Sequence, residues 1–271
     1  MATHNDVRIL GYLTKDPNIL NEGQEGIEQA LFIVRTVHRE FDGYMGNKFQ
    51  EIMIFYDGKE LMQKVKGLQQ YDVVDIAGVF NICAANKTSK CTECMSKNIK
   101  RQGSITFVYP ISLRKLNTVR QLIDDKDKKN DYTPDDILVR HYSEISNKVT
   151  IVGTVVSDPE LVKTKYGVFC RYRLGVDRKY YIKTQSDITA DYPWVYSYGK
   201  QAEMDAVHLQ QGTVVLVYGF MQNRKVKVPF TCESCGITYL YKDYATEFIP
   251  YSVEYLSDYI TDEEIAKKKM M

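Results

Sequence analysis

The sequence predicts an all-β protein with short helices, made of two tandem copies of one unit related by internal duplication. The segment from Asn5 to Gly11, followed by Asp16 and Pro17, returns from Asn147 to Gly153, followed by Asp158 and Pro159. A repeat of this kind constrains the predicted fold more strongly than any single strand or helix does. Later landmarks recur at nearly the same offset: Gln69, Gln70, Val73, Val74, Gly78, Cys91, Cys94 and Phe107 return as Gln210, Gln211, Val214, Val215, Gly219, Cys232, Cys235 and Phe248.

Each copy reads as three strands, a short helix, a fourth strand, an extended excursion that carries cysteines, and a fifth strand. Alternating β-branched and aromatic residues predict the strands, and apolar residues at helical spacing predict the helix. Five strands with a helix between the third and fourth is the order of the five-stranded Greek-key barrel called the OB-fold, which commonly binds oligonucleotides. The predicted ranges are 5–13, 29–39, 49–56, helix 58–69, 73–80 and 104–115 in copy one, and 147–156, 168–178, 193–198, helix 200–210, 214–221 and 246–256 in copy two.

The remaining segments lie between and after the copies. Residues 124–131 form a charged, apolar-poor run typical of a solvated linker, and Thr133 with Pro134 has the pattern of a helix start. Thr261 followed by Glu264 is a capping-box start that predicts a short C-terminal helix. The predicted organisation is therefore 1–118 for copy one, 119–142 for a linker with a short helix, 143–258 for copy two, and 259–271 for a C-terminal helix or tail.

Composition limits the class of protein. The chain has 271 residues, of which 44% are hydrophobic, 12% aromatic and 26% charged, and its formal net charge is +1. These values exclude a highly charged disordered chain. No run approaches the ~18 apolar residues of a membrane span, and the N-terminus lacks a secretory signal, so we expect a cytoplasmic protein without membrane contact. Because the net charge of the chain is close to zero, affinity for nucleic acid would come from local basic patches or from base stacking.

The cysteines predict a structural metal site. Cys91 and Cys94 form one Cys-x-x-Cys turn, and Cys232 and Cys235, followed by Gly236, form another. A structural zinc site takes four such ligands in a tetrahedron, and each copy supplies half, so one zinc per chain, shared by the two excursions, is the economical interpretation. Two reduced thiol pairs, or zinc bound between separate chains, are the alternatives. The other two cysteines, Cys83 and Cys170, fit small strand residues.

Aromatic and basic residues predict a surface for single-stranded nucleic acid, which needs rings for base stacking and cations along the phosphates. Trp194, Tyr196 and Tyr198 alternate along one strand and so share a face. The alternative is that these rings fill the barrel and Val195 faces outward. Copy one is expected to have a poorer platform, with isoleucines in place of the first two rings. The candidate nucleic-acid-binding residues are Trp194, Tyr196, Tyr198, Lys200, Phe169, Arg171, Arg173, Arg178, Phe32, Arg35, Arg39, Tyr56 and Lys59, and the isoleucines are Ile52 and Ile54.

Three phrases, at residues 11–17, 198–203 and 211–220, resemble the bacterial and phage single-stranded DNA-binding proteins. The resemblance implies an OB-fold protein that protects single-stranded DNA without sequence preference, in replication or recombination of a bacterial, phage or mobile-element genome. It also implies replication or recombination proteins as partners and a base-stacking role for Tyr198. Copy one departs by one inserted residue at 56–60, and the cysteine turns depart from the family pattern.

Enzyme functions are disfavoured, because the sequence has no phosphate-binding loop, no H-E-x-x-H motif and no G-x-S-x-G elbow. Two alternative functions fit the same pattern: a protein-interaction or scaffold module of a replication or transcription assembly, and an RNA-binding protein. The duplication predicts either a monomer that acts as a pseudo-dimer or a homodimer that resembles a four-barrel assembly.

Overall fold

A computed structural model describes residues 3–24, 26–41, 43–89, 91, 93–94, 99–118, 133–178 and 188–270. Strands predominate, as the sequence predicts. In chain order the elements of the first half are β1 (His4–Leu13), β2 (Asn18–Leu20), β3 (Gln29–Val37), β4 (Phe49–Tyr56), α1 (Met62–Lys66), β5 (Asp72–Ser89) and β6 (Ile99–Thr118). They continue with α3 (Pro134–Tyr142), β7 (Asn147–Val155), β8 (Glu160–Thr164), β9 (Gly167–Asp177), β10 (Ala190–Asp191), β11 (Trp194–Tyr198), α4 (Gly199–His208), β12 (Val214–Thr231), β13 (Thr238–Ser257) and α5 (Asp262–Met270).

The two halves close into barrels with the same strand order. In the first half β1 pairs with β3 and β5, β3 with β4, β5 with β6, and β4 meets β6 in parallel at Ile54 and Val108. In the second half β7, β9, β11, β13 and β12 repeat this circuit, with the parallel pair at Val195 and Phe248. The predicted OB-fold class is therefore confirmed, and the common circuit agrees with the predicted duplication.

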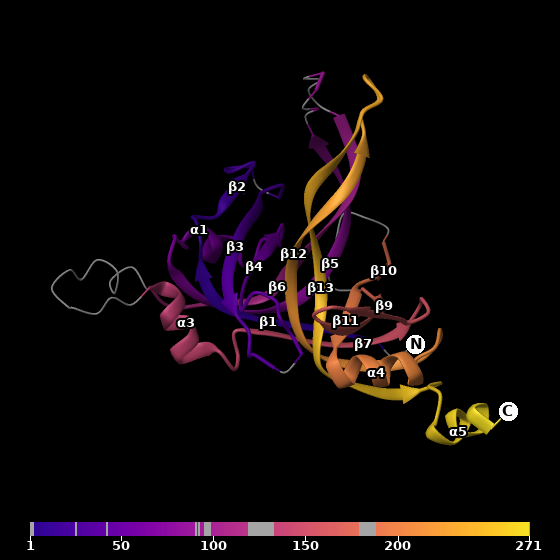
Figure 1. Cartoon of the computed structure of the whole chain (residues 1–271). Helices are drawn as coiled ribbons and strands as arrows, with labels where there is room; N and C mark the ends of the chain where they lie inside the picture. Colours follow the sequence, from indigo (N-terminus) through magenta and orange to yellow (C-terminus); the bar gives the residue numbers. More distant parts are fainter. Residues whose placement is uncertain are drawn as a thin grey trace.

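One sheet runs through both barrels, because β1 and β7 pair antiparallel from His4 opposite Val152 to Ile9 opposite Asn147. The barrels thus lie side by side around a central pair of strands (Figure 1). The buried apolar residues of both halves form one continuous hydrophobic cluster. The two copies therefore share a core as well as a sheet.

Several repeated residues of the sequence have equivalent structural roles. The buried Asn5 amide donates to the carbonyl of Phe80 at 2.9 Å and accepts from its N–H at 3.1 Å. The equivalent Asn147 makes the same two bonds, at 2.9 and 3.1 Å, with Met221. Phe80 and Met221 lie two residues past the end of the pairing with β1 and with β7, so each asparagine satisfies backbone groups on an edge that those strands no longer cover.

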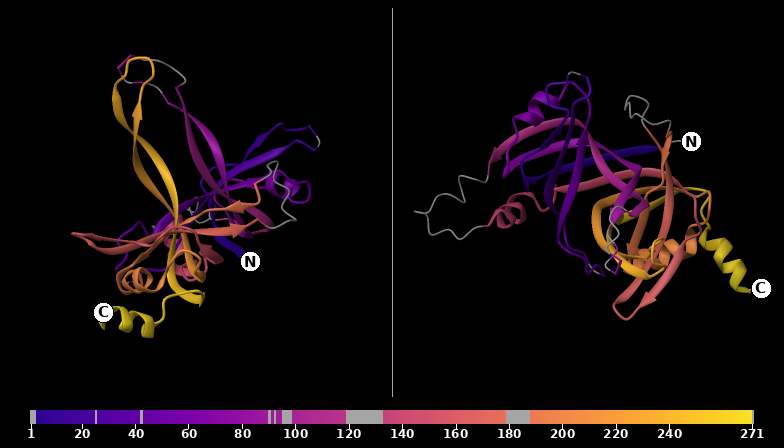
Figure 2. Two further views of the ribbon diagram at one scale, coloured as in Figure 1. Left: turned by 90° about the vertical axis from the view of Figure 1, so that its right-hand side faces the viewer. Right: turned by 90° about the horizontal axis from the view of Figure 1, so that it is seen from above.

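The cysteine excursions are long β-hairpins. β5 continues nine residues past the predicted end of its strand, and β6 begins five residues before the predicted start. These extensions carry mixed polar residues, because they leave the barrel and have no core to face, so the alternation that marks a half-buried strand is weak. The β5–β6 and β12–β13 hairpins project from the same side of the molecule and approach each other at their ends (Figures 1 and 2).

The helices are short. α1 spans five residues, much less than the predicted 58–69, and Gly67 is its C-terminal cap. The linker helix α3 begins as predicted, with Thr133 and Asp136 in a reciprocal capping box. α5 follows a similar contact between Thr261 and Glu264. Among the described helices, none combines the length and the hydropathy of a membrane-crossing segment.

Candidate nucleic-acid interface and cysteine cluster

The outer face of β11 carries a row of aromatic rings. Val195 and Ser197 are fully buried in the barrel, so Trp194, Tyr196 and Tyr198 project to the other side. Trp194 is 37% exposed, and the two tyrosines are half-buried. The arrangement in which the rings fill the barrel and Val195 faces outward is therefore wrong.

Neighbouring strands extend this row. Phe169 of β9 lies beside the row, with ring centroids 5.8 Å from Tyr196 and 6.1 Å from Tyr198. The guanidinium groups of Arg171 and Arg173 lie 5.8 and 5.5 Å from the Trp194 ring centroid. We call Trp194, Tyr196, Phe169, Arg171 and Arg173 the platform.

Sequence reasoning missed two residues at the border of the platform. Arg224 of β12 lies over the Tyr196 ring at 5.9 Å, and Tyr192 lies beneath Arg173 at 5.7 Å. Arg224 directly precedes a run in which Lys225 and Lys227 alternate with Val226 and Val228, and this basic run was the available signal.

Carboxylates hold two of the arginines in place. A hydrogen bond from Arg171 to Glu160 raises the pKa of that guanidinium, and a bond to the buried Glu247 does the same for Arg224. Both guanidiniums are partly exposed, so each stays charged while it is fixed beside a ring. The platform therefore offers flat surfaces with positive charge at their edges.

The Tyr198 ring is less accessible to a base than the resemblance implies. The loop between β3 and β4 of copy one reaches copy two, where the Tyr44 ring meets Tyr198 edge to face at 5.5 Å and its hydroxyl bonds to Gln222. In the same loop His38 stacks on Phe220 at 3.8 Å. Burial raises the pKa of Tyr198 to about 12. Lys200 lies nearby on α4 and is exposed.

Arg178 does not lie on this surface, which corrects the sequence prediction. Its guanidinium forms an ion pair with Asp191 at 2.7 Å and donates to the carbonyl of Ile82 in copy one, also at 2.7 Å. The two side chains of the ion pair are 5% and 1% exposed. The strand-end arginine therefore joins the two copies, and it is inaccessible to a ligand.

The candidates on copy one also need correction. Phe32 and Tyr56 are 3% and 4% exposed and belong to the barrel core. Ile52 and Ile54 are fully buried, so they are not equivalent to Trp194 and Tyr196. Strand pairing shifts the comparison by one residue, because the parallel pairs make Ile54 equivalent to Val195, an offset of 141 and not the 142 that relates β1 to β7. The outward positions that match the platform are Met53 and Phe55, opposite Ile33 and Leu31.

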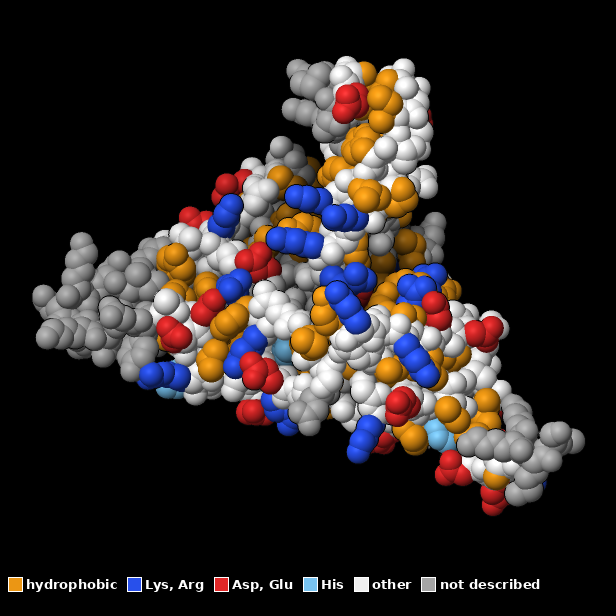
Figure 3. All heavy atoms as spheres, in the orientation of Figure 1, with side chains coloured by type: hydrophobic (Ala, Val, Ile, Leu, Met, Phe, Trp, Pro, Cys, Tyr) orange, Lys and Arg blue, Asp and Glu red, His pale blue; other side chains and the backbone are white. Residues whose placement is uncertain are grey.

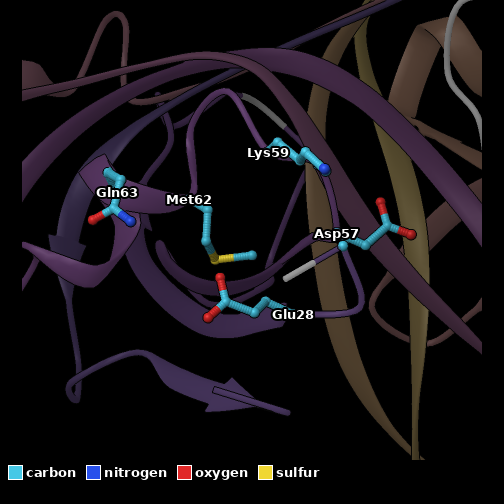
Figure 4. Close-up of a pocket in the computed structure, with 7 residues that line it drawn as sticks. Glu28, Asp57, Lys59, Met62 and Gln63 are labelled. Carbon is cyan, nitrogen blue, oxygen red and sulfur yellow. The ribbon is translucent and has the colours of Figure 1, made fainter. Parts of the chain in front are cut away.

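The basic candidates of copy one are engaged or lie elsewhere. Arg35 forms two bonds with Asp135 of α3 at 2.7 Å, and Arg39 lies over Tyr251 at 4.9 Å. Lys59 borders an open pocket of about 250 Å³ beside α1, with Glu28 and Asp57 near it (Figure 4). Two carboxylates with one ammonium give that pocket no excess of positive charge. Copy one therefore has no platform of the copy-two type among the described residues.

The structure brings the four predicted cysteines together. Their sulfur atoms all lie within 4.8 Å of one another, and the pairs Cys91 with Cys235 and Cys94 with Cys232 are 3.7 Å apart. Each of these pairs joins one hairpin to the other. Tetrahedral metal–sulfur bonds of about 2.3 Å place ligand sulfurs about 3.8 Å apart, so the geometry fits a metal ion. Gly236, at φ +70°, makes the turn after the second pair.

Comparison with known proteins finds similar sequences over part of the second half of the chain. The model of the single-strand binding protein family matches residues 146–230, which contain the platform. Two proteins of Clostridium acetobutylicum, single-stranded DNA-binding proteins 2 and 3, are 32% and 34% identical over 80 residues. These matches cover 29% of this chain and 59% and 54% of the relatives, so the chain spans little more than half the length of each.

The fold is shared over nearly the whole chain. The single-stranded DNA binding protein of Thermus aquaticus superposes with a TM-score of 0.59 at 14% identity, covering 95% of both chains. A deletion variant of that protein gives 0.61 at 15% identity, covering 97% and 98%. The family match accords with the prediction of a binding protein rather than an enzyme. Residues 146–230 are thus similar to the single-strand binding protein family, and the fold of the whole chain is similar to that of the Thermus aquaticus protein.

Proposed function

We propose that the protein binds single-stranded DNA with little sequence preference, with bases stacked on the platform of copy two. The observation that carries this proposal is the exposed Trp194 ring with two arginines over it. Every base has a π-face, so a ring stacks on any base, and each stack contributes ~1 to 3 kcal/mol. Arg171, Arg173 and Lys200 are placed to approach phosphates. The bound strand would be one exposed in replication or recombination.

Substitution of Trp194 tests this proposal. Trp194→Ala should weaken binding of a fluorescently labelled oligonucleotide by about 5- to 160-fold, which is the equivalent of one lost stack. Tyr166→Ala is the matched control, because this ring is 69% exposed and lies outside the platform. Equal affinities for the two variants would refute the platform. In the unsubstituted protein, Trp194 fluorescence should be quenched as the strand binds.

RNA is the alternative ligand. Stacking alone does not distinguish the sugars, because recognition of RNA depends on contacts with the 2′-hydroxyl. Competition by RNA and by duplex DNA against the labelled single strand measures the preference. We expect duplex to compete poorly, since paired bases cannot present their faces to the platform.

We also propose that the cysteine cluster holds one structural zinc ion. The ligand set is four sulfurs, two of them buried, with spacing that suits a tetrahedral ion. Four thiolates would leave no open coordination position, so the role would be structural. The bound ion would join the ends of the two hairpins, and so fix one copy against the other.

Metal content tests the zinc proposal. Elemental analysis should give one zinc per chain, and Cys91→Ser and Cys232→Ser should each release it, although they lie in different copies. Cys83→Ser is the control, because that thiol is outside the cluster. Two zinc ions per chain, or full retention after either cluster substitution, would contradict a shared site.

A further inference from the structure

The β3–β4 loop of copy one places an aromatic ring against the last ring of the β11 row in copy two. Tyr44 meets Tyr198 edge to face at 5.5 Å, and the Tyr44 hydroxyl bonds to the Gln222 side chain. The backbone of the loop is also close, because a Cβ added at Gly43 would lie 3.4 Å from Gly199 at the start of α4. Part of the Tyr198 surface is therefore occupied by a residue of the other copy.

This loop is fixed at its base and exposed at its tip. At the base, the buried His38 ring lies 2.9 Å from the carbonyl of Asn47, which closes the loop, and it stacks on a ring of copy two. At the tip, the residues that follow Tyr44 are exposed: Met45, to 76%, and Gly46. The tip can therefore move while the base stays in place.

Gly46 provides the space that the Tyr44 ring occupies. A Cβ added at Gly46 would lie 2.0 Å from the Tyr44 hydroxyl oxygen, so a side chain there would displace the ring. The φ angle of Gly46 is outside the left-handed region, and the backbone therefore does not itself require glycine. The glycine is needed for the closed position of Tyr44.

A base that stacks on Tyr198 must displace Tyr44 from several contacts. Besides Tyr198, the Tyr44 ring meets Phe220 and His38 edge to face at 5.4 and 5.1 Å. An edge-to-face ring pair and a neutral hydrogen bond each contribute about 2- to 13-fold to an equilibrium, and a base stack contributes about 5- to 160-fold. The contacts of Tyr44 therefore offset much or all of a stack on Tyr198.

We propose that Tyr44 is a lid that restricts the access of a DNA base to Tyr198, so that copy one limits the number of rings that copy two offers. This inference rests on the proposed function of the platform. With the lid closed, bases stack on Trp194 and Tyr196; with the lid open, Tyr198 is the third ring of the same row. Hydrophobic side chains lie among lysine and arginine side chains where the two barrels meet (Figure 3).

Removal of the lid tests this proposal. Tyr44→Ala should strengthen binding of a labelled single-stranded oligonucleotide by about 5-fold or more, because a stack on Tyr198 no longer competes with Tyr44. Adding Tyr198→Ala to this variant should remove the gain, whereas Tyr198→Ala alone should change the affinity by less than about 5-fold. Met45→Ala is the matched control, since it alters an exposed side chain of the same loop and should leave the affinity unchanged.

Gly46→Ala is a second variant, which opens the lid without removing an aromatic ring. The added methyl group should displace Tyr44 and strengthen binding in the same direction as Tyr44→Ala. In the double variant, Gly46→Ala should add nothing further, because the ring that it displaces is absent. Thermal unfolding shows which variants are folded, and Gly46→Ala provides the test if Tyr44→Ala does not fold.

The outcomes separate the lid from the platform. Unchanged or weaker binding in the folded Tyr44→Ala and Gly46→Ala variants would overturn the lid, because the loop would then only join the copies. A gain that persists after Tyr198→Ala would also overturn it, because the released surface would not be Tyr198. Failure of the platform gives a different result: Trp194→Ala and Tyr166→Ala would then bind equally, with or without Tyr44.

Discussion

Substitution of Arg178 by methionine separates a role in stability from a role in DNA binding. The guanidinium bonds to both carboxylate oxygens of Asp191, at 2.9 and 2.7 Å, and to the Ile82 carbonyl. Asp191 also accepts from the Ile82 N–H at 2.8 Å. Arg178→Met would leave the carboxylate, which is 1% exposed, without its counterion. Removing one partner of a buried ion pair costs about 3 to 5 kcal/mol.

Urea unfolding measures that loss as a decrease in the free energy of unfolding. A decrease of this size corresponds to a melting temperature lower by about 6 to 20 °C in a chain of this length. The double variant Arg178→Met with Asp191→Asn is the control: it removes the unpaired charge and keeps an acceptor for Ile82, so stability should largely return. An unchanged unfolding curve with weaker oligonucleotide binding would refute the structural role and favour a phosphate contact.

Two further predictions concern the junction and the barrel. Burial lowers the pKa of His38, while the charges of Glu40 and Lys48 act on it in opposite directions. The unfolded chain therefore binds the proton more readily than the folded chain, and the free energy of unfolding should fall as pH drops from 7 to 5.5. Thermal unfolding of the His38→Gln variant should depend less on pH, and an unchanged pH dependence would contradict this assignment. Gly219 lies at a register shift, where an added Cβ would be 2.0 Å from the Ile249 carbonyl oxygen, so Gly219→Ala should cost about 1 to 3 kcal/mol by urea unfolding. In the control Gly103→Ala the added Cβ meets only the flexible Lys87 side chain, and equal losses in the two variants would exclude the steric explanation.

Two kinds of feature could be predicted from the sequence: residues that recur in both copies, and ligands whose number is fixed by the chemistry of a metal site. Asn5 and Asn147 mark the same strand position in each barrel, and their equivalent bonds explain the repeat. The cysteine cluster was predictable because a closed thiolate site needs four ligands and each excursion has two. The prediction that the two cysteine turns meet in space therefore rests on the number of ligands and not on any local sequence pattern.

Other features depend on which way a strand faces and on what closes against it. Alternation along β4 defines two faces, but the sequence does not say which one faces the core. An offset between the copies that was one residue too large assigned Tyr56, which is buried, to the binding surface in place of Phe55. Arg178 looked like a surface cation because its partners, Asp191 and Ile82, lie near it only after both barrels form.

The pairing of β1 with β7 has a consequence for how the protein responds to dilution. Two barrels on separate chains would be in equilibrium with free subunits, and their association would depend on protein concentration. Here the six-residue register from His4 to Ile9 is intramolecular. The two barrels therefore stay paired at any concentration, and the ratio of platforms to chains is constant when the protein is scarce.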